Sequence, residues 1–397
     1  MNSFTDELDR RLASLREQNL FRELRRVDSA TGPRIKIGGQ TLLNFSSNDY
    51  LGLANHPALK AAAVAAIDQF GAGAGASRLI CGSLAPFHEL EAALAAFKMT
   101  GAALTFSTGY AAAVGTITAL LGKDDIIILD KLVHACIVDA AKLSGAKLRV
   151  FAHNDLNDLE DKLKWADQFS KAECGMRKAE ILIITESIFS MDGDAAPLLE
   201  IVALKQKYGA WLMVDEAHAT GIIGHDGRGL ADELGVSDQI EIQMGTLGKA
   251  LGASGGYICG SRALIDFLVN RARSFIFSTA PVPAAAAAAT AGIKLVQSAE
   301  GEALRRQLQQ RITTFKSEIG NRKSEILCAI IPLILDDEEK ALAAAVRLRE
   351  QNIFVPAIRY PTVARGAARL RLTLTAAHTP EDVLQLSNAL KTLDLGL

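Results

Sequence analysis

The residues that decide the fold are WLMVDEAHATG at positions 211–221, where a strongly apolar run ends in an Asp, a Glu and a His. Apolar runs of similar length recur along the chain, separated by helix-length segments such as 110–121 and 198–208. We expect strands at residues 102–106, 126–129, 148–151, 181–184, 211–214, 240–244 and 257–259. Because continuous apolar strands are buried on both faces, this pattern predicts an α/β fold with a mostly parallel sheet between layers of helices.

The pattern changes after an alanine-rich segment at 284–298. Expected strands then alternate with expected helices, which is typical of a smaller α+β domain. The strands are expected at 326–334, 354–358 and 370–374, and the helices at 338–350 and 380–393.

The N-terminal residues show a helical pattern of their own. Phe4, Leu8, Leu12 and Leu15 predict an amphipathic arm that ends near the turn-forming residues 28–33. A length of 397 residues favours two or three structural parts. We therefore expect an N-terminal arm at 1–47, a large α/β domain at 48–288 and a small C-terminal α+β domain at 289–397.

Composition excludes several classes of function. Lys plus Arg number 43 and Asp plus Glu 45, and no run of like charges forms a basic stripe, so we expect no nucleic-acid partner. The five cysteines are scattered without a CxxC pair, so we expect no metal site and no disulfide framework, as in a protein of a reducing compartment.

Neither membrane insertion nor export is expected. The most apolar long segment, residues 280–296, contains two prolines near its start and also Lys294, so it does not match a membrane span. Asp6, Glu7 and Asp9 are unlike the start of a secretory or transit peptide. A cytoplasmic location is therefore predicted.

Polar residues that follow expected strands are the candidates for a functional site. In open α/β sheets, ligands bind beyond the carboxyl ends of the strands. Four segments occupy such positions, and they are residues 107–110, 185–190, 215–218 and 246–249.

Three segments also match motifs of other protein classes, but each lacks the required context. Asp-Glu-Ala-His at 215–218 spells a helicase box, yet no GxxxxGK[ST] loop precedes it, and the Gly-Lys pair at 248–249 comes later and is followed by Ala250 where a P-loop needs a hydroxyl. Residues 252–256 satisfy GxSxG around Ser254, but they lead into an expected strand and not into a helix. Residues 71–76 follow a helical segment, so they are a weak match to a dinucleotide fingerprint.

Lys249 is the candidate that fits its surroundings best. It has Thr246 and several glycines beside it, as a Schiff-base lysine next to a phosphate would require, although a surface lysine in a flexible loop fits too. Asp215 lies 34 residues earlier, at the end of another expected strand, so both side chains could face one pocket. Such an aspartate would keep a pyridine nitrogen protonated, and the alternative for it is a helix N-cap.

Other polar residues could complete a site for a phosphorylated aromatic cofactor. His218 could reach a phenolic oxygen on the ring. Ser107, Thr108 and the amides of Gly109 and Tyr110 open an expected helix directly after a strand, which favours binding of a phosphate. His134 follows the expected strand 126–129 and could stack on a ring, although a lone histidine is more often structural.

Seven segments in order resemble the α-oxoamine synthases, which are fold-type I enzymes of pyridoxal 5'-phosphate. These enzymes join an amino acid to an acyl thioester with loss of carbon dioxide, and the likeness runs from about residue 15 to about residue 395. The segments are SNDYLGL at 47–53, STGY at 107–110, FSMDGD at 189–194, VDEAHATG at 214–221, GTLGKALG at 245–252, FSTAPVP at 277–283 and RLRLTLTAAHT at 369–379.

Within this family, FAHND at 151–155 and residues 358–379 look most like the biotin-pathway members that condense L-alanine with a pimeloyl thioester, carried on CoA or on a carrier protein. The alternative is another member, such as one that joins glycine to acetyl-CoA. Two departures touch the substrate side. Arg-Tyr-Pro-Thr-Val at 359–363 replaces the usual RPPTV, and the loop at 71–78 is richer in alanine than the usual GSGGSR.

The resemblance implies roles around the cofactor ring. Lys249 would form the Schiff base, His134 would stack on the ring and Asp215 would pair with the pyridine nitrogen. His218 and Ser190 would contact the phenolic oxygen. The freed amine of Lys249 would remove the α-proton of the amino acid, and His134 would donate a hydrogen bond to the oxyanion of the thioester.

The resemblance also implies the phosphate and substrate contacts. Thr246 and the Ser107, Gly109 and Tyr110 segment would hold the phosphate, and Ser278 and Thr279 would reach in from the second subunit of a homodimer. The substrate contacts carried over are Arg371 for the amino-acid carboxylate, together with Arg22, Asn48 and Thr362.

Two other classes of function remain as alternatives. A non-catalytic member acting as a partner subunit would be expected to lack the lysine, and Lys249 is present. A serine hydrolase would depend on Ser254, and loss of esterase activity on substitution of that residue would identify it.

Overall fold

The computed structural model describes residues 3–172, 179–319 and 328–393. These form two compact units. The smaller unit comprises Met1–Tyr50, Met191–Gly193 and Gln307–Leu397, and the larger unit comprises Leu51–Ser190 and Asp194–Arg306.

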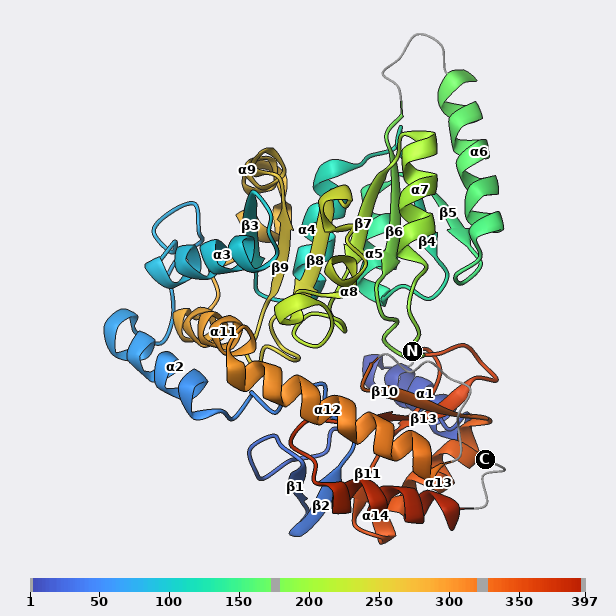
Figure 1. Cartoon of the computed structure of the whole chain (residues 1–397). Coiled ribbons are helices and arrows are strands. Elements are labelled where there is room, and N and C mark those ends of the chain that lie inside the picture. The colour runs from blue at the N-terminus through green and yellow to red at the C-terminus, as the bar shows by residue number, and fades with distance from the viewer. Residues whose placement is uncertain (1–2, 173–178, 320–327, 394–397) are drawn as a thin grey trace. The chain divides into compact units, whose positions relative to one another are not determined.

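A seven-stranded sheet forms the centre of the larger unit (Figure 1). Its strand order is β3-β9-β8-β7-β6-β4-β5, and β9 alone runs in the direction opposite to the other six strands. The strands are β3 (Ala102–Phe106), β4 (Ile126–Asp130), β5 (Lys147–Phe151), β6 (Ile181–Glu186), β7 (Trp211–Asp215), β8 (Ile242–Thr246) and β9 (Gly256–Gly260). Six of these strands therefore end at one edge of the sheet, in Phe106, Asp130, Phe151, Glu186, Asp215 and Thr246.

Helices and short turns complete the larger unit. α11 packs against α2 and α3, and α4 packs against α5. The elements are α2 (Pro57–Phe70), α3 (Ala85–Phe97), α4 (Gly109–Leu120), α5 (Ala135–Ser144), α6 (Leu156–Ala172), α7 (Leu198–Tyr208), η1 (His225–Gly227), α8 (Leu230–Glu233), η2 (Ser237–Gln239), α9 (Arg262–Arg271), α10 (Arg273–Ile276) and α11 (Pro283–Val296).

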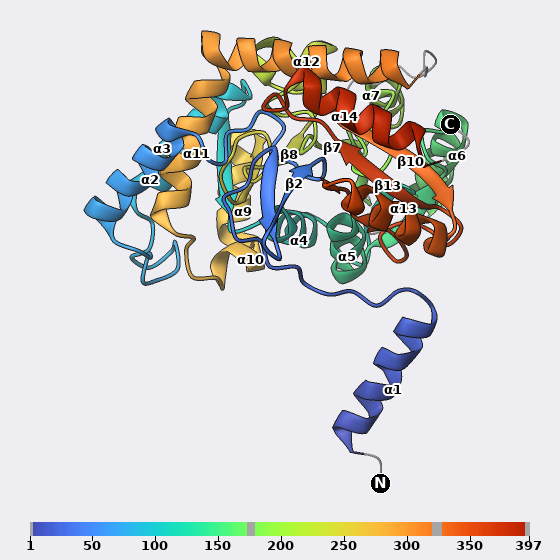
Figure 2. The same ribbon diagram turned by 90° about the horizontal axis from the view of Figure 1, so that it is seen from below.

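The smaller unit contains two three-stranded sheets, ordered β1-β2-β11 and β10-β13-β12. Their strands are β1 (Arg34–Ile37), β2 (Gln40–Asn44), β10 (Ile330–Asp336), β11 (Ile353–Phe354), β12 (Ala357–Ile358) and β13 (Ala368–Thr373). The helices are α1 (Phe4–Glu17), the C-terminal part of α12 (Ala299–Glu318), α13 (Glu338–Glu350) and α14 (Pro380–Lys391). None of the residues of α1 is buried, and in Figure 2 this helix extends away from the sheets of its own unit.

The predicted fold class is confirmed, because the expected apolar runs form a mostly parallel sheet and the C-terminal residues form smaller sheets. The bounds of two expected strands differ from the observed ones, each for a local reason. β8 begins at Ile242 and not at 240, because the turn η2 occupies the preceding residues. The expected strand at 354–358 is two short strands around Pro356, which has no N–H to donate to a ladder.

Two further expectations concern the N-terminal helix and the expected strand at 326–334. The N-terminal helix ends at Glu17, well before the turn at 28–33, and Asn19 has a left-handed φ of 56° that a helix cannot accommodate. Residues 326 and 327 of the expected strand 326–334 lie outside the described residues. No helix in the described part of the chain is long and apolar enough to cross a membrane.

Candidate active site

Lys249 lies three residues beyond the end of β8 and contacts a histidine from the turn that follows the neighbouring strand. Its Nζ is 2.6 Å from Nε2 of His218, which follows β7 and is buried. A Cβ on Gly221 would come within 2.7 Å of the Ala250 Cβ, so the absence of a side chain there lets the two loops approach closely. The expectation that Lys249 and the 215–218 segment share one site agrees with this geometry.

Asp215 is the last residue of β7 and is 6% exposed. Its Oδ1 accepts a hydrogen bond from the Ala217 amide at 2.9 Å, but a turn and not a helix follows, so it is not a helix N-cap. Burial raises the pKa of Asp215, and the positive charge of Lys249 acts in the opposite direction. A cation placed against this carboxylate would favour its ionised form, which is what a protonated pyridine nitrogen supplies.

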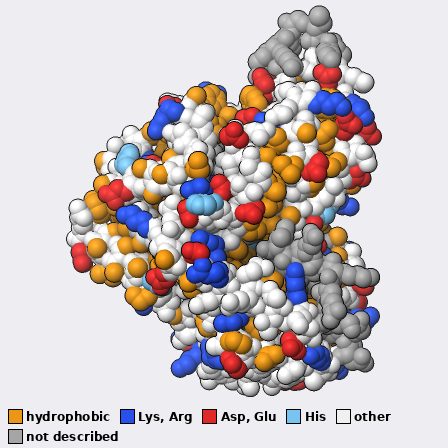
Figure 3. All heavy atoms as spheres, viewed as in Figure 1, with side chains coloured by type: hydrophobic (Ala, Val, Ile, Leu, Met, Phe, Trp, Pro, Cys, Tyr) orange, Lys and Arg blue, Asp and Glu red, His pale blue; other side chains and the backbone are white. Residues whose placement is uncertain are grey.

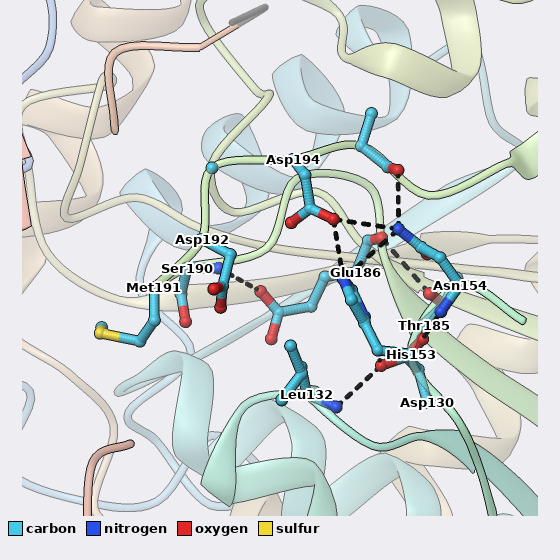
Figure 4. Close-up of polar contacts among 12 residues, drawn as sticks. Asp130, Leu132, His153, Asn154, Thr185, Glu186, Ser190, Met191, Asp192 and Asp194 are labelled. Atoms are coloured by element: carbon cyan, nitrogen blue, oxygen red, sulfur yellow. Dashed lines mark hydrogen bonds and ion pairs between the residues drawn. The ribbon is translucent and has the colours of Figure 1, made fainter. Parts of the chain in front are cut away.

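Glu186 is a buried acid that motif reasoning missed. It ends β6, and its Cα pairs with that of Asp215 in the sheet. Its Oε2 accepts a hydrogen bond from the Ser190 amide at 3.1 Å (Figure 4). Burial, followed by the nearby charge of Asp215, raises the pKa of Glu186. The available signal was an acid that ends a buried and largely apolar strand, the same signal that identified Asp215.

His134 is the N-cap of α5, and its Nδ1 accepts a hydrogen bond from the Cys136 amide at 3.2 Å. This contact is the structural role that a lone histidine often has. Burial of part of the ring lowers the pKa of His134, while the charge of Asp215 raises it and that of Lys249 lowers it. His134 therefore lies within electrostatic reach of the predicted centre, with its ring biased towards the neutral form.

The expected anion site lies at the start of α4. Thr108 caps this helix by accepting a hydrogen bond from the Ala111 amide at 3.0 Å, and Gly109 is its first residue. A Cβ on Gly109 would be 4.0 Å from the Thr246 Cβ, so the helix start and the end of β8 lie next to each other. A Cβ on Gly256 would clash with Gly109 Cα and N at 2.6 Å, which shows how closely β9 approaches the helix.

This arrangement fits a phosphate. The first amides of a helix have no intrahelical acceptor, and the N-terminal end of the helix dipole attracts anions. Ser107 is exposed beside them, while the Tyr110 hydroxyl donates to the Asp139 carboxylate at 2.7 Å. The Thr246 hydroxyl donates to the Gly255 carbonyl and accepts from the Gly248 amide, and these contacts orient it at the start of the lysine loop.

Ser278 and Thr279 lie in the segment before α11. Thr279 forms a β-bridge with Ser77, and the Ala280 amide donates to the Ala76 carbonyl at 3.0 Å. The glycine-rich loop at 71–78 is therefore held against the 278–280 segment of the same chain.

The remaining predicted site residues belong to the smaller unit. Arg371 lies on β13 and donates to Asn48 Oδ1 at 3.1 Å, which brings two of the expected substrate contacts together. Arg22 donates to the Tyr360 carbonyl at 2.9 Å, close to Thr362, whose amide donates to the Arg359 carbonyl.

Arg22 also lines a cavity of about 480 Å³ within the smaller unit. The cavity is also lined by Arg25, Arg349 and Arg359, by Glu23, and by apolar residues of α13 and of the segment around Phe354. Such a cavity suits an elongated apolar group with an anionic end.

The rival motifs do not have the required structure. The GxSxG segment around Ser254 lies in a loop that runs into β9, with no helix after the serine. No cluster of three or more metal-ligating side chains occurs among the described residues. Acidic and basic side chains alternate over the described part of the face shown in Figure 3, without a broad area of either sign.

Comparison with known proteins identifies the family. Residues 40–390 match the family described as Aminotransferase class I and II. An 8-amino-7-oxononanoate synthase of Geobacter sulfurreducens is 46% identical over 375 residues, covering 94% of each chain, and one of Thermoanaerobacter pseudethanolicus is 44% identical over 383 residues, covering 95% and 94%.

Solved structures agree. A serine palmitoyltransferase from S. paucimobilis superposes with a TM-score of 0.89 at 28% identity, covering 98% of each chain. The structure of an 8-amino-7-oxononanoate synthase from Francisella tularensis has a TM-score of 0.73 at 30% identity, covering 89% of this chain and 96% of the other. The chain therefore belongs to the aminotransferase class I and II family and, within it, to the α-oxoamine synthases that its motifs resemble.

Proposed function

We propose that this protein condenses L-alanine with a pimeloyl thioester to give 8-amino-7-oxononanoate, carbon dioxide and a free thiol in biotin biosynthesis. The observation that carries the proposal is the 2.6 Å contact between Lys249 and His218 beside the buried Asp215, in a chain 46% identical to a synthase of that name. The acyl donor is carried on CoA or on a carrier protein.

Pyridoxal 5'-phosphate is the cofactor, and it supplies an electron sink for the charge that forms on the α-carbon of the amino acid. Lys249 would bind its aldehyde, and Asp215 would hold the proton on the pyridine nitrogen. His218 and Ser190 would bind the phenolic oxygen, while His134 would stack on the ring. The start of α4 and Thr246 would bind the phosphate, supported by their close approach.

Proton transfer is assigned to Lys249. When not bound to the cofactor, the amine of Lys249 would take the α-proton of the amino acid and later return one. The neighbouring His218 can hydrogen-bond this amine and keep it directed towards the α-carbon of the amino acid, since only 2.6 Å separates the two nitrogens. His134 would donate a hydrogen bond to the oxyanion of the thioester carbonyl.

Substrate binding is assigned to the smaller unit. Arg371 would bind the amino-acid carboxylate with its planar guanidinium, oriented by its hydrogen bond to Asn48. Arg22 and Thr362 would contact the acyl donor. The arginine-lined cavity that contains Arg22 supports an anionic donor, because both a pimeloyl chain and its phosphate-bearing carrier have negative charges.

We further propose that the enzyme is a cytoplasmic homodimer whose active sites include Ser278 and Thr279 of the second subunit. Leu79, Ile80 and Phe277 are 50%, 79% and 71% exposed around the Ser77–Thr279 bridge, so they offer an apolar surface to a second copy. Cys81, Cys136 and Cys259 are free thiols, which suits the reducing cytoplasm.

The cofactor assignment is tested by colour. Purified protein should show a visible band that borohydride bleaches, and reduction should attach the cofactor to the peptide that contains Lys249. Lys249→Ala should lose the lysine-linked band, while the control Lys131→Ala, at an exposed lysine, should keep it. A colourless wild type that takes up no pyridoxal phosphate would disprove the proposal.

The substrate pair is tested separately. Alanine, glycine and serine should be compared by spectroscopic titration, followed by thiol release from pimeloyl-, acetyl- and succinyl-CoA. We expect the highest kcat/KM with alanine and the pimeloyl thioester. Preference for glycine with acetyl-CoA would overturn the substrate pair and leave the family assignment intact.

A further inference from the structure

We propose that His153 is a positioning residue which, as an imidazolium, holds the loop that carries Ser190 against the loop that leads to His134. Its catalytic meaning rests on the proposed function, because Ser190 is assigned to the phenolic oxygen of the cofactor and His134 to stacking on its ring. No role in the reaction has so far been given to His153, Asp130 or Asp194.

His153 lies between two carboxylates (Figure 4). Its Nδ1 is 3.0 Å from Asp130 Oδ1, and its Nε2 is 2.7 Å from Asp194 Oδ2. A neutral imidazole has one N–H donor, whereas an imidazolium has two. Since each ring nitrogen faces a carboxylate oxygen, the doubly protonated ring is the form that satisfies both contacts.

Asp130 connects the ring to the loop that leads to His134. It ends β4, has no exposed surface, and accepts from the Leu132 amide at 2.7 Å and the Asn154 amide at 2.9 Å. Leu132 is two residues before His134. One buried carboxylate therefore joins the chain after β4 to the chain after β5.

Asp194 connects the ring to the loop that carries Ser190. The Phe189 amide donates to the Asp194 carbonyl at 3.0 Å, and the Asn154 side chain donates to Asp194 Oδ2 and to the Ala195 carbonyl, each at 3.1 Å. Ser190 lies inside this closed segment and is buried. Its position therefore depends on how the segment is held.

The charge of the ring is maintained by its surroundings. Asp130 and Asp194 are the titratable groups that face it, and the Phe189 ring covers it edge-on with centroids 4.3 Å apart. Burial favours the neutral ring, but the hydrogen bonds to the two carboxylates outweigh burial and raise the pKa of His153 to about 10. The link should persist throughout the neutral range.

The three linked loops follow β4, β5 and β6, which are neighbours in the sheet. β4 lies between β5 and β6, so His153, which follows β5, must reach across the end of β4 to meet Asp194. Asp130, at the end of β4, lies on this path. The geometry thus makes His153 a cross-link between two loops that are not adjacent.

The charge is tested first without cofactor. Melting temperatures of apo wild type and His153→Gln should be compared from pH 6 to pH 10. A histidine with a raised pKa stabilises the folded state fully below its unfolded value and loses this effect as the pH rises through the folded value. The difference in melting temperature between wild type and His153→Gln should thus be largest at pH 6 and vanish near pH 10. The control His225→Gln, at an exposed histidine next to Asp226, should show a smaller difference.

The positioning role is tested with cofactor bound. In His153→Gln and Asp194→Asn, we expect the pH at which the visible Schiff-base band changes to shift, and the dissociation constant of pyridoxal phosphate to rise about tenfold, as when a hydrogen bond to a charged group is lost. His153→Lys, which keeps a cation, should partly restore both.

The results of these two tests distinguish a failure of the His153 proposal from a failure of the proposed function. A changed melting profile with an unshifted band titration and unchanged cofactor affinity would reduce His153 to a purely structural residue and overturn the proposal. If His153→Gln does not fold, Asp194→Asn tests the positioning role, and NMR titration of the His153 ring in wild type tests its charge. A His153 ring that titrates near the ordinary value of a histidine would refute the proposed imidazolium. Absence of any cofactor band in wild type would refute the proposed function instead and leave the charge test unaffected.

Discussion

Asp215 and Glu186 end neighbouring parallel strands, and their Cα atoms are partners in the sheet. Both side chains are buried, so ionising the two together is unfavourable, and the pKa of each is raised mainly by burial. A protonated pyridine nitrogen carries one positive charge. A single negative charge on the pair of acids would balance it. We therefore propose that Glu186 stays protonated and that Asp215 carries the negative charge of the site.

Replacing Asp215 tests this division. Asp215→Asn keeps the shape but removes the charge that holds the pyridine proton, so kcat/KM should fall by roughly 10²–10³, as when one preorganised electrostatic contact to a transition state is removed. Steady-state thiol release measures the change. Asp124→Asn, at an exposed aspartate of the same unit, should keep wild-type activity, and an active Asp215→Asn enzyme would contradict the role.

Replacing Glu186 has an effect that depends on pH. The folded pKa of Glu186 is raised above 4.5, so the wild type loses stability as the pH rises from about 4.5 towards that folded value. Glu186→Gln lacks this titration. The melting temperature of apo Glu186→Gln relative to wild type should therefore increase between pH 5 and pH 8. A constant difference over this range would show that Glu186 is not held protonated.

At the scale of elements, the start of α4 depends on a close approach by β9. Gly256 faces the backbone of Gly109 with no space for a side chain. Gly256→Ala should push α4 away from Thr246, weaken binding of pyridoxal phosphate at least about tenfold and destabilise the fold by about 1–3 kcal/mol, a typical cost of overpacking.

Spectroscopic titration and urea unfolding measure these two effects. Gly122→Ala is the matched control, because a Cβ there would meet nothing within 4 Å and its φ is not positive. If Gly256→Ala binds the cofactor as tightly as wild type, the helix start is not the phosphate site.

At the scale of the whole molecule, the exposed apolar residues around the Ser77–Thr279 bridge are the proposed dimer surface. Phe277→Asp would place a charge in a buried interface, so we expect a shift towards monomer in sedimentation velocity and, with it, weaker cofactor binding. Leu143→Asp, at another exposed apolar residue of the larger unit, should leave the oligomeric state unchanged. A wild type that is monomeric at micromolar concentration would refute the shared site.

Much of the fold could be predicted because its signals are local. Runs of mostly apolar residues identified every strand of the seven-stranded sheet, and α7 and α13 agree with the expected helices at both ends. The residues around Lys249 and Asp215 were found because each follows such a run. These signals need only the neighbouring residues along the chain.

The sequence by itself therefore determined the fold class and the family, and it predicted the residues that the cofactor chemistry would require. Only the tertiary structure decided which of them meet: Lys249 with His218, Glu186 with Asp215, and His153 with both Asp130 and Asp194. The reason is physical. Strand order and burial bring these residues together across long stretches of chain, and the charge of each carboxyl or imidazole depends on the neighbours it then acquires.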